Sequence, residues 1–257
     1  MTKPLIAVSG KGGTGKTTVS ALLVRRLVSS GMRPVLAVDA DPNSCLGELL
    51  GLEVEGTLAD LREETRNKAA DGAGTRISEL DLGLNQIISE GVGLDLLTMG
   101  RPEGAGCYCY INALLREWLR KARGNYAVTV IDNEAGMEHV SRLIAGSIDT
   151  LVVVAEPTVP AARAARRINE LAGKLPMQVA RRLLVWNKVT DPDDLDAFGE
   201  IAGVEAFDSV ASLPYSEILE NVHRRGAQVK IEDIEAPGLD EIARIAGQPG
   251  FSPSASV

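Results

Sequence analysis

A glycine-rich loop near the start of the chain constrains the fold more than any other feature. The loop spans Gly10 to Thr17, reads G-K-G-G-T-G-K-T, and has the spacing of a phosphate-binding loop, G-x-x-x-x-G-K-[ST]. A short apolar run, Leu5–Val8, precedes it, and an amphipathic stretch, Lys16–Ser30, follows it. The sequence therefore predicts a strand, a phosphate-binding loop and a helix in that order. Glycines let main-chain N–H groups approach phosphate oxygens, and the helix N-terminus adds positive potential.

The residue types in this loop predict binding of a nucleotide with Mg²⁺. The Lys16 ammonium would reach the β- and γ-phosphates, and the Thr17 hydroxyl would ligate Mg²⁺. The residues that we expect to surround the phosphates are Gly12, Gly13, Thr14, Gly15, Lys16, Thr17 and Thr18.

Apolar runs alternate with amphipathic stretches along most of the chain, which predicts a parallel sheet with helices between its strands. The expected strands are Leu5–Val8, Val35–Val38, Leu94–Thr98, Ala127–Ile131, Leu151–Val154 and Leu183–Trp186. The expected helices are Lys16–Ser30, Ile111–Lys121, Val159–Lys174 and Tyr215–Arg224. We predict an α/β fold, a doubly wound and mostly parallel sheet flanked by helices.

One domain accounts for residues 1–247, and the Ser- and Pro-rich residues 248–257 are expected to form a mobile tail. Between Gly56 and Gly83 the apolar pattern weakens. We interpret this segment as a surface excursion rather than a domain linker, because too few strands follow it to form a second domain.

Composition excludes several other classes of protein. The 257 residues include 27 Lys and Arg against 35 Asp and Glu, a formal charge of −8, which excludes a nucleic-acid binder that works by bulk positive charge. The longest aliphatic run, Leu151–Ala155, is far shorter than the roughly 20 residues that cross a bilayer. No basic, apolar leader of the secretory type is evident, so we expect a cytoplasmic protein with reduced thiols.

Three aspartates follow predicted strands and so lie at the carboxyl edge of the sheet, where open α/β sheets bind ligands. Asp39 and Asp41 come after Val35–Val38, and Asp132 comes after Ala127–Ile131. A single Asp in such a place is most often a helix cap or a turn residue. Three of them together with a phosphate loop indicate a nucleotide and Mg²⁺ site.

Cys107 and Cys109 lie in a glycine-rich segment after the strand Leu94–Thr98. In an extended segment, residues i and i+2 project to the same side and are poorly placed for a mutual disulfide, so the two thiolates can chelate a metal. Two thiolates leave a tetrahedral site for a thiophilic metal half filled, and a two-fold axis would supply four of them. The alternative is two small buried side chains. Cys45 is expected to pack in the core, and His139 to be a cap or a surface residue.

The loop also resembles a known family. Its pattern K-G-G-x-G-K-T-T, Lys11 to Thr18, resembles the deviant Walker A loop of the MinD/ParA-like P-loop ATPases. The resemblance implies that Lys11 reaches the phosphates of a partner subunit in an ATP-promoted homodimer. It further implies that Asp41 orients the attacking water, that Asp39 belongs to the Mg²⁺ shell and that Asp132 is a Walker B aspartate.

The same resemblance implies three further contacts to ATP. The Asn187 amide would pair with the adenine edge, Pro214 would line the base pocket, and the Gly136 N–H would face the γ-phosphate.

Two segments resemble the CooC-type ATPases in particular. These are R-P-E-G-x-G-C-x-C-Y, from Arg101 to Tyr110, and D-N-E-A-G-M-E-H, from Asp132 to His139. CooC-type ATPases mature carbon monoxide dehydrogenase by helping nickel into its cluster. The resemblance implies ATP, Mg²⁺, nickel or zinc on Cys107 and Cys109, and that dehydrogenase as client. It implies no nucleic-acid or membrane partner, and it gives Glu134 no role.

Two other functions remain open at this point. A partitioning or positioning ATPase of the MinD/ParA type would share the nucleotide site, but the acidic charge and the Ser/Pro tail offer neither a basic patch nor an amphipathic anchor. An iron–sulfur reductase of the nitrogenase iron-protein type would also use thiolates from a dimer. That type of reductase has widely separated cysteines, one near the segment Asp132–Gly136, and this segment contains none.

Overall fold

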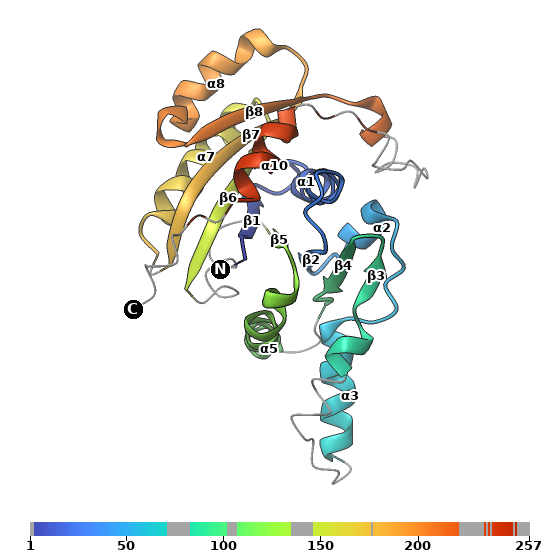
Figure 1. Ribbon diagram of the computed structural model, residues 1–257. Helices are drawn as coiled ribbons and strands as arrows, with labels where there is room; N and C mark the ends of the chain where they lie inside the picture. The colour runs from blue at the N-terminus through green and yellow to red at the C-terminus, as the bar shows by residue number, and fades with distance from the viewer. Residues whose placement is uncertain are drawn as a thin grey trace.

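The computed structural model contains one eight-stranded sheet with the strand order β3-β4-β2-β5-β1-β6-β7-β8 (Figure 1). It describes residues 3–70, 83–101, 107–134, 146–175, 177–220, 234, 236, 238–248 and 250, with the backbone alone at 66–70 and 107–110. All neighbouring strands are parallel except β3 and β4, which are antiparallel. The predicted doubly wound, mostly parallel α/β fold is confirmed.

The strands are β1 Leu5–Gly10, β2 Val35–Ala40, β3 Ser89–Gly91, β4 Leu94–Thr98, β5 Val128–Asn133, β6 Ser147–Ala155, β7 Gln178–Val189 and β8 Ser209–Pro214. The helices are α1 Lys16–Ser29, α2 Leu46–Leu50, α3 Leu58–Ala70, α5 Cys107–Ala122, α7 Val159–Ala172, α8 Leu195–Ala202 and α10 Gly238–Ala246. Short 3₁₀ turns occur at Arg123–Asn125, Pro192–Asp194 and Val204–Ala206. Residues 83–86 and 217–220 are also helical.

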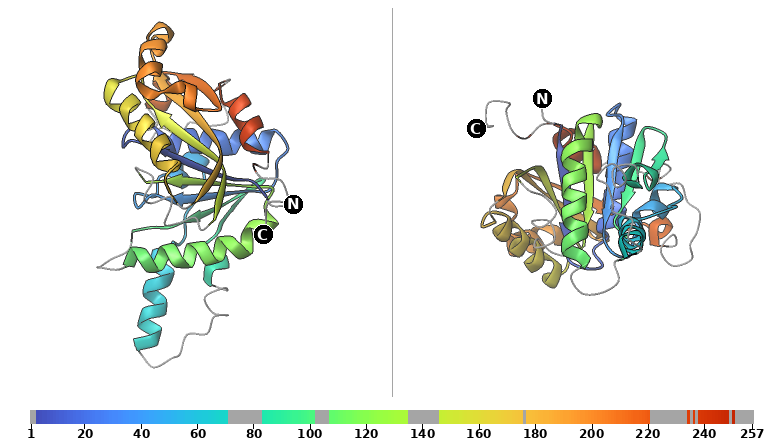
Figure 2. Two further views of the ribbon diagram at one scale, coloured as in Figure 1. Left: turned by 90° about the vertical axis from the view of Figure 1, so that its left-hand side faces the viewer. Right: turned by 90° about the horizontal axis from the view of Figure 1, so that it is seen from below.

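Helices cover both faces of the sheet, as the views in Figure 2 show. One apolar cluster packs α3, α5, α7 and α8 against one face through residues such as Leu36, Leu115 and Ile168. The other cluster packs α1, α2 and α10 against the opposite face through residues such as Val8, Leu23 and Ile242. Strands buried on both faces read as continuous apolar runs, which is why the sequence revealed them.

Two elements differ from the sequence-based expectation in ways that affect function. Helix α5 begins at Cys107 rather than near Ile111, so Cys107 and Cys109 belong to its first turn and not to an extended segment. The expectation of an extended C-x-C segment is therefore wrong. Strands β2 and β5 run further than expected and include Asp39 and Asp132, which end up inside the sheet.

Helix α3 occupies the first part of the segment Gly56–Gly83, which the sequence analysis interprets as a surface excursion, and it projects away from the sheet (Figure 1). Residues 71–82 of that segment lie outside the described part of the chain. Thr57 caps this helix, because its N–H and its hydroxyl both donate to the Asp60 carboxylate while the Asp60 N–H donates to the Thr57 hydroxyl. Leu58 and Leu61 anchor the first turns in the core.

Two residues of the expected C-terminal tail contact the body. The Gly250 N–H donates to Asp149 at 2.7 Å, and Arg181 donates to the Gln248 carbonyl at 2.6 Å. Residues 251–257 lie outside the described part of the chain. Among the described helices, none combines the length and the apolar character that a bilayer crossing needs.

Candidate functional site

The glycine-rich loop joins the end of β1 to the start of α1 at the carboxyl edge of the sheet. Gly13 and Gly15 both have a φ of +85°, a left-handed conformation that L side chains rarely adopt. At Gly10, an added Cβ would lie 2.3 Å from the Val154 carbonyl oxygen. Thr14 closes the loop internally, because its hydroxyl donates to the Lys11 carbonyl at 2.9 Å. The Lys16 side chain is buried beneath the loop, and the Thr17 side chain is partly exposed.

The end of β7 supports this loop from outside. The Asn187 amide nitrogen donates to the Thr14 carbonyl at 2.9 Å, and Lys188 Nζ donates to the Gly13 carbonyl at 3.0 Å. Lys188 also forms an ion pair with Glu156, at 2.6 Å, and its own φ is +60°. Two adjacent side chains therefore hold consecutive carbonyl groups of the loop, which fixes the direction of the loop peptides.

Two buried aspartates lie side by side below the loop, since Asp39 of β2 is in register with Asp132 of β5. Asp39 accepts hydrogen bonds from the Leu46 N–H at 2.9 Å and the Asp41 N–H at 3.2 Å. Burial raises the pKa of Asp39 to about 7, and the charge of Asp132 adds to this effect, while the two backbone hydrogen bonds oppose it. Asp39 thus holds the turn that leads into α2.

Asp132 faces α1, and its Oδ1 accepts a hydrogen bond from the Ser20 hydroxyl at 2.9 Å. Burial raises the pKa of Asp132 to about 6, although the hydroxyls of Thr17 and Ser20 and the charge of Lys16 act in the opposite direction. Its Oδ2 is buried without a hydrogen-bond partner. An unpartnered carboxylate oxygen next to a threonine hydroxyl fits the oxygen-rich environment that Mg²⁺ prefers.

The turn after β2 presents Asp41 and Cys45 to the same region. Asp41 Oδ1 accepts hydrogen bonds from the backbone and the side-chain amides of Asn43, each at 2.9 Å. Cys45 is exposed at the N-cap position of α2, so the expectation that it packs in the core is wrong. Its pKa is raised, first because the thiol is partly shielded from solvent and then by the neighbouring carboxylates Asp39 and Asp41.

One cavity of about 520 Å³ lies at the glycine-rich loop. The predicted site residues Thr14, Asp39 and Asp132 do not line it. Among the residues predicted from sequence, its walls include Gly12, Gly13, Gly15, Lys16, Thr17, Thr18, Asp41, Asn187 and Pro214. The walls also include Lys188 and Tyr215, which belong to the two segments that resemble base-binding segments of the family. They further include Asn43, Cys45, Glu134, Ser216, Leu219 and Glu220, for which sequence reasoning gave no role in the site. The Asn-Lys pair that ends β7 was the one available signal for Lys188. The size of the cavity lies in the usual range for small-molecule sites.

Other predicted residues lie apart from this cavity or beyond the described chain. The Lys11 side chain is exposed and does not line the cavity. Gly136 and His139 fall outside the described residues, as do the side chains of Cys107 and Cys109. Within the part of the chain whose side chains are described, no group of three or more His, Cys, Asp or Glu side chains could hold a metal ion.

The fold and the loop together define the class of protein, a P-loop ATPase. Residues 5–229 match the family model described as the CobQ/CobB/MinD/ParA nucleotide binding domain, and the chain belongs to this family. It is 37% identical, over 86% of this chain and 88% of the relative, to an uncharacterised ATP-binding protein of Methanocaldococcus jannaschii. It is 32% identical, over 86% of this chain and 87% of the relative, to the carbon monoxide dehydrogenase accessory protein CooC of Rhodospirillum rubrum.

Solved structures agree on the fold. The septum site-determining protein MinD of Pyrococcus horikoshii, in complex with Mg-ADP, superposes with a TM-score of 0.64 at 22% identity and covers 96% of this chain and 95% of its own. The ParA family ATPase of Chlorobium tepidum gives a TM-score of 0.64 at 19% identity, over 94% of this chain and 99% of its own. At these identities the likeness is one of fold.

Proposed function

We propose that this ATPase is a metallochaperone that uses ATP to help nickel into carbon monoxide dehydrogenase. The observation that carries the proposal is the pair Cys107 and Cys109 at the start of α5, in a chain that is 32% identical to a carbon monoxide dehydrogenase accessory protein over most of its length. Carbon monoxide dehydrogenase is the client in this proposal, and nickel, or zinc in its place, is the cargo.

The nucleotide half of the proposal rests on the cavity at the glycine-rich loop. Lys16 binds the β- and γ-phosphates, and main-chain N–H groups from Gly12 to Thr18 surround them. Bound Mg²⁺, held by Thr17 and through water by Asp132, would neutralise charge on the phosphates. Asp41 orients the attacking water, and Asp39 keeps the Asp41 turn in place through the 3.2 Å hydrogen bond to its N–H.

The remaining contacts follow the family pattern. In that pattern the N–H of Gly136, a residue outside the described part of the chain, would face the γ-phosphate. The Asn187 amide nitrogen is engaged by the Thr14 carbonyl, so its oxygen is the atom that accepts from the adenine amino group. Pro214 lines the cavity on the same side as Asn187 and would pack against the base.

The metal half of the proposal rests on the thiols at the start of α5. Each chain contributes two cysteines, and a closed thiolate site uses four ligands, so a two-fold homodimer would complete the site. Residues i and i+2 of a helix do not face each other, so binding of one ion by both Cys107 and Cys109 requires the first turn of α5 to unwind. A helix N-terminus favours the thiolate form of cysteine, which is the form that binds metal. A change in subunit packing when ATP binds or is hydrolysed would then alter the metal site and release the ion to the client.

Metal titration tests this proposal. We expect the parent protein to bind one Ni²⁺ or Zn²⁺ per dimer, and the double variant Cys107→Ser/Cys109→Ser to lose that binding. Cys45→Ser is the matched control, because it removes the other thiol of the chain and should leave the stoichiometry unchanged. Equal binding by the double variant and the parent protein, or one ion per monomer regardless of dimerisation, would contradict the shared site while leaving the ATPase assignment intact.

A further inference from the structure

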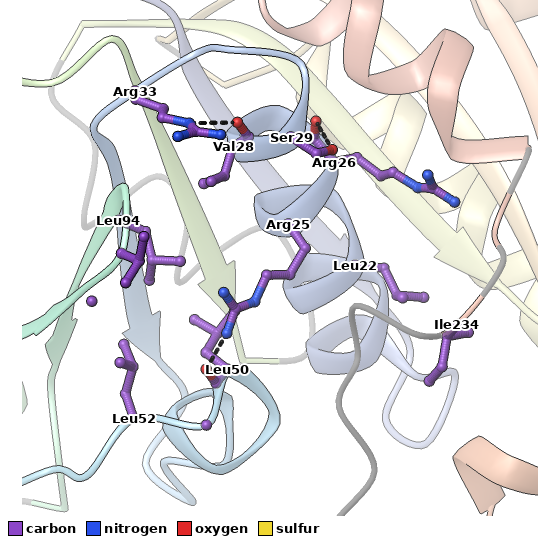
Figure 3. Close-up of a pocket in the computed structure, with 13 residues that line it drawn as sticks. Leu22, Arg25, Arg26, Val28, Ser29, Arg33, Leu50, Leu52, Leu94 and Ile234 are labelled. Atoms are coloured by element: carbon purple, nitrogen blue, oxygen red, sulfur yellow. Dashed lines mark hydrogen bonds between the residues drawn. The ribbon is translucent and has the colours of Figure 1, made fainter.

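Beside α1 lies a cavity of about 660 Å³ whose arginines already have partners within the protein (Figure 3). Arg25 donates to the Leu50 carbonyl, Arg33 donates at 2.9 Å to a carbonyl in the last turn of α1, and Arg26 pairs with Asp240 at 3.4 Å. The charged groups of this cavity therefore give no reason to expect a ligand there.

A cavity of a different kind, of about 570 Å³, lies between α8 and the edge strand β8 (Figure 1). It shares no lining residue with the nucleotide cavity. Its lining includes three apolar and three acidic side chains, Trp186, Val204, Val210, Asp196, Glu200 and Glu205. We call this cavity the α8 groove.

The α8 groove is open because α8 covers β7 and leaves part of β8 exposed. Val210 and Ser212 of β8 are in register with Leu184 and Trp186 of β7, so all four side chains point to the same face of the sheet. Leu184 and Trp186 are buried in the apolar cluster beneath α7 and α8. Val210, in contrast, is 43% exposed, and Ser212 is exposed as well. The last strand of the sheet thus presents an apolar side chain to solvent beside the groove.

The rim of the α8 groove is acidic. Asp196 and Glu200 lie at positions i and i+4 on one side of α8, and Glu205 follows in the turn after it. No Lys or Arg lines the groove. Within the part of the chain that the structure describes, none of these three carboxylates has an ion-pair partner. On the neighbouring helix α7, Arg166 pairs with Glu170 of its own helix instead.

The sequence around the groove carries the same charge. From Val189 to Ser216 it contains no Lys or Arg, and every residue of this stretch belongs to the described part of the chain. Its acidic residues are Asp191, Asp193, Asp194, Asp196, Glu200, Glu205 and Asp208. Lys188, the cation directly before the stretch, pairs with Glu156. The groove therefore lies in a region of negative charge that the local chain does not neutralise.

The carboxylates of the groove do not converge on one ion. Among the described residues, no group of three or more His, Cys, Asp or Glu side chains could hold a metal ion. Separate carboxylates beside an apolar floor suit a chain that carries several cations with apolar side chains between them. The charge of the groove and its exposed valine thus favour a peptide over a metal ion.

We propose that the α8 groove binds a basic peptide segment of a protein partner, with apolar side chains between its Lys or Arg residues. The proposal rests on the charge and the exposed apolar surface of the groove and is independent of metal delivery. Strands β7 and β8 lead from the groove to the nucleotide cavity, because Trp186 directly precedes Asn187 and Ser212 lies two residues before Pro214. A bound peptide and bound ATP would contact the same two strands, and any coupling between them would be reciprocal.

Fluorescence anisotropy with a labelled peptide of repeated Lys-Leu dipeptides tests the proposal on the full chain. We expect saturable binding to the parent protein and about tenfold weaker binding to Asp196→Asn/Glu200→Gln, equivalent to about 1.4 kcal/mol. Both side chains are exposed on α8, so the substitutions should not disturb folding. The matched control is Glu53→Gln/Glu55→Gln, which removes the same charge from exposed positions near β3, at the opposite edge of the sheet, and should leave the affinity unchanged.

Val210→Lys supplies a second variant that keeps all three carboxylates. Val210 is partly exposed, and the added ammonium group should repel the peptide and weaken its binding by a similar factor. Equal affinity of the parent protein and both groove variants for the Lys-Leu peptide would overturn the proposal. Equal weakening by the control variant and the α8 double variant would do the same, because it would show attraction by net charge alone. Binding about tenfold tighter to Arg224→Gln/Arg225→Gln than to the parent protein would show that a basic segment of this chain occupies the groove instead.

Discussion

The buried carboxylate of Asp132 destabilises the unliganded protein, because only one of its two oxygens has a hydrogen-bond partner. Oδ1 accepts a hydrogen bond from Ser20, whereas Oδ2 is buried without one. Burial is the main reason that its pKa rises to about 6 from 3.8, so the native protein binds a proton at Asp132 that the unfolded chain releases between these pH values. The free energy of unfolding therefore falls as the pH rises from about 4 to about 6. Above pH 6 Asp132 is charged in both states, and its burial destabilises the protein in full.

We predict that Asp132→Asn stabilises the unliganded protein at pH 8 and much less at pH 4. A shift of this size corresponds to about 2 to 3 kcal/mol, or roughly 4 to 10 °C in Tm for a chain of this length. Thermal unfolding of the parent protein and the variant at both pH values measures it. The variant should also lose the Mg²⁺-dependent part of the stabilisation by ATP. If the difference in Tm between Asp132→Asn and the parent protein is the same at pH 4 and pH 8, the charged Asp132 carboxylate does not destabilise the protein.

Lys188 is the residue that links the phosphate loop to the neighbouring strand ends. Its ammonium group bonds both to the Gly13 carbonyl and to Glu156. We predict that Lys188→Met weakens ATP binding several-fold while leaving the fold intact, because the loop peptides lose the contact that orients them. Titration with a fluorescent ATP analogue provides the measurement.

Glu156→Gln separates the two contacts of Lys188, since it removes the ion pair and keeps the bond to Gly13. It should reduce ATP affinity less than Lys188→Met does. If Lys188→Met binds ATP as tightly as the parent protein, the loop holds its conformation without this residue.

At the scale of elements, the unit formed by β1, the loop and α1 depends on the close approach of the loop to β6. We predict that Gly10→Ala lowers the Tm markedly, because its Cβ would lie 2.3 Å from the Val154 carbonyl oxygen and the backbone of one strand must move. Overpacking of this kind costs about 1 to 3 kcal/mol. Gly12→Ala is the matched control in the same loop, since a Cβ there meets nothing within 4 Å. Equal melting temperatures for the two variants would show that β1 and β6 can separate at no cost.

The sequence predicted the central elements and missed the peripheral ones for a physical reason. Strands β1, β2, β5 and β6 are buried on both faces, so their apolar runs are continuous. Strand β8 lies at the edge and alternates exposed and partly exposed residues, which gives a weak signal. Helix α3 is mostly polar, and its capping box at Thr57 and Asp60 was the available clue to where it begins.

The candidate site also has residues that the sequence predicted and residues that it did not. The loop and the aspartates were predictable because each is a local motif at a strand end. The wall formed by Tyr215, Ser216, Leu219 and Glu220 was not, because it belongs to the cavity only through the position of β8 in the sheet. Cys45 was misassigned because its exposure depends on the turn at Ser44, whose φ is +53°, and not on its residue type.

At the scale of the whole molecule, the strand order explains how distant segments meet at one site. Strand β1 lies between β5 and β6, so the loop that follows it is flanked by Asp132 on one side and by Glu156 and Lys188 on the other. Local patterns do not determine strand order. The nucleotide cavity is therefore a property of the sheet as a whole, although each of its motifs is local.

Lys11 is one of the loop residues that do not line this cavity, together with Gly10 and Thr14. It lies next to the phosphate-binding glycines, yet its side chain is exposed and does not line the cavity. A lysine in this position is free to meet phosphates bound by a second subunit across a two-fold axis. We predict that Lys11→Gln binds ATP with the affinity of the parent protein but no longer dimerises in its presence, because the lost charge would have paired with the partner's phosphates.

Sedimentation velocity in the presence of a slowly hydrolysed ATP analogue measures the effect of Lys11→Gln. Lys16→Ala is the informative comparison, because it should lose dimerisation through loss of nucleotide binding itself. Lys11→Gln, in contrast, should keep nucleotide binding and lose dimerisation. The chain carries enough negative charge, −8, to oppose self-association at low salt, so the assay should be run at physiological ionic strength, where the Debye length is about 8 Å. A Lys11→Gln variant that still dimerises with the analogue would remove Lys11 from the subunit interface and leave the dimer, if it forms, to other contacts.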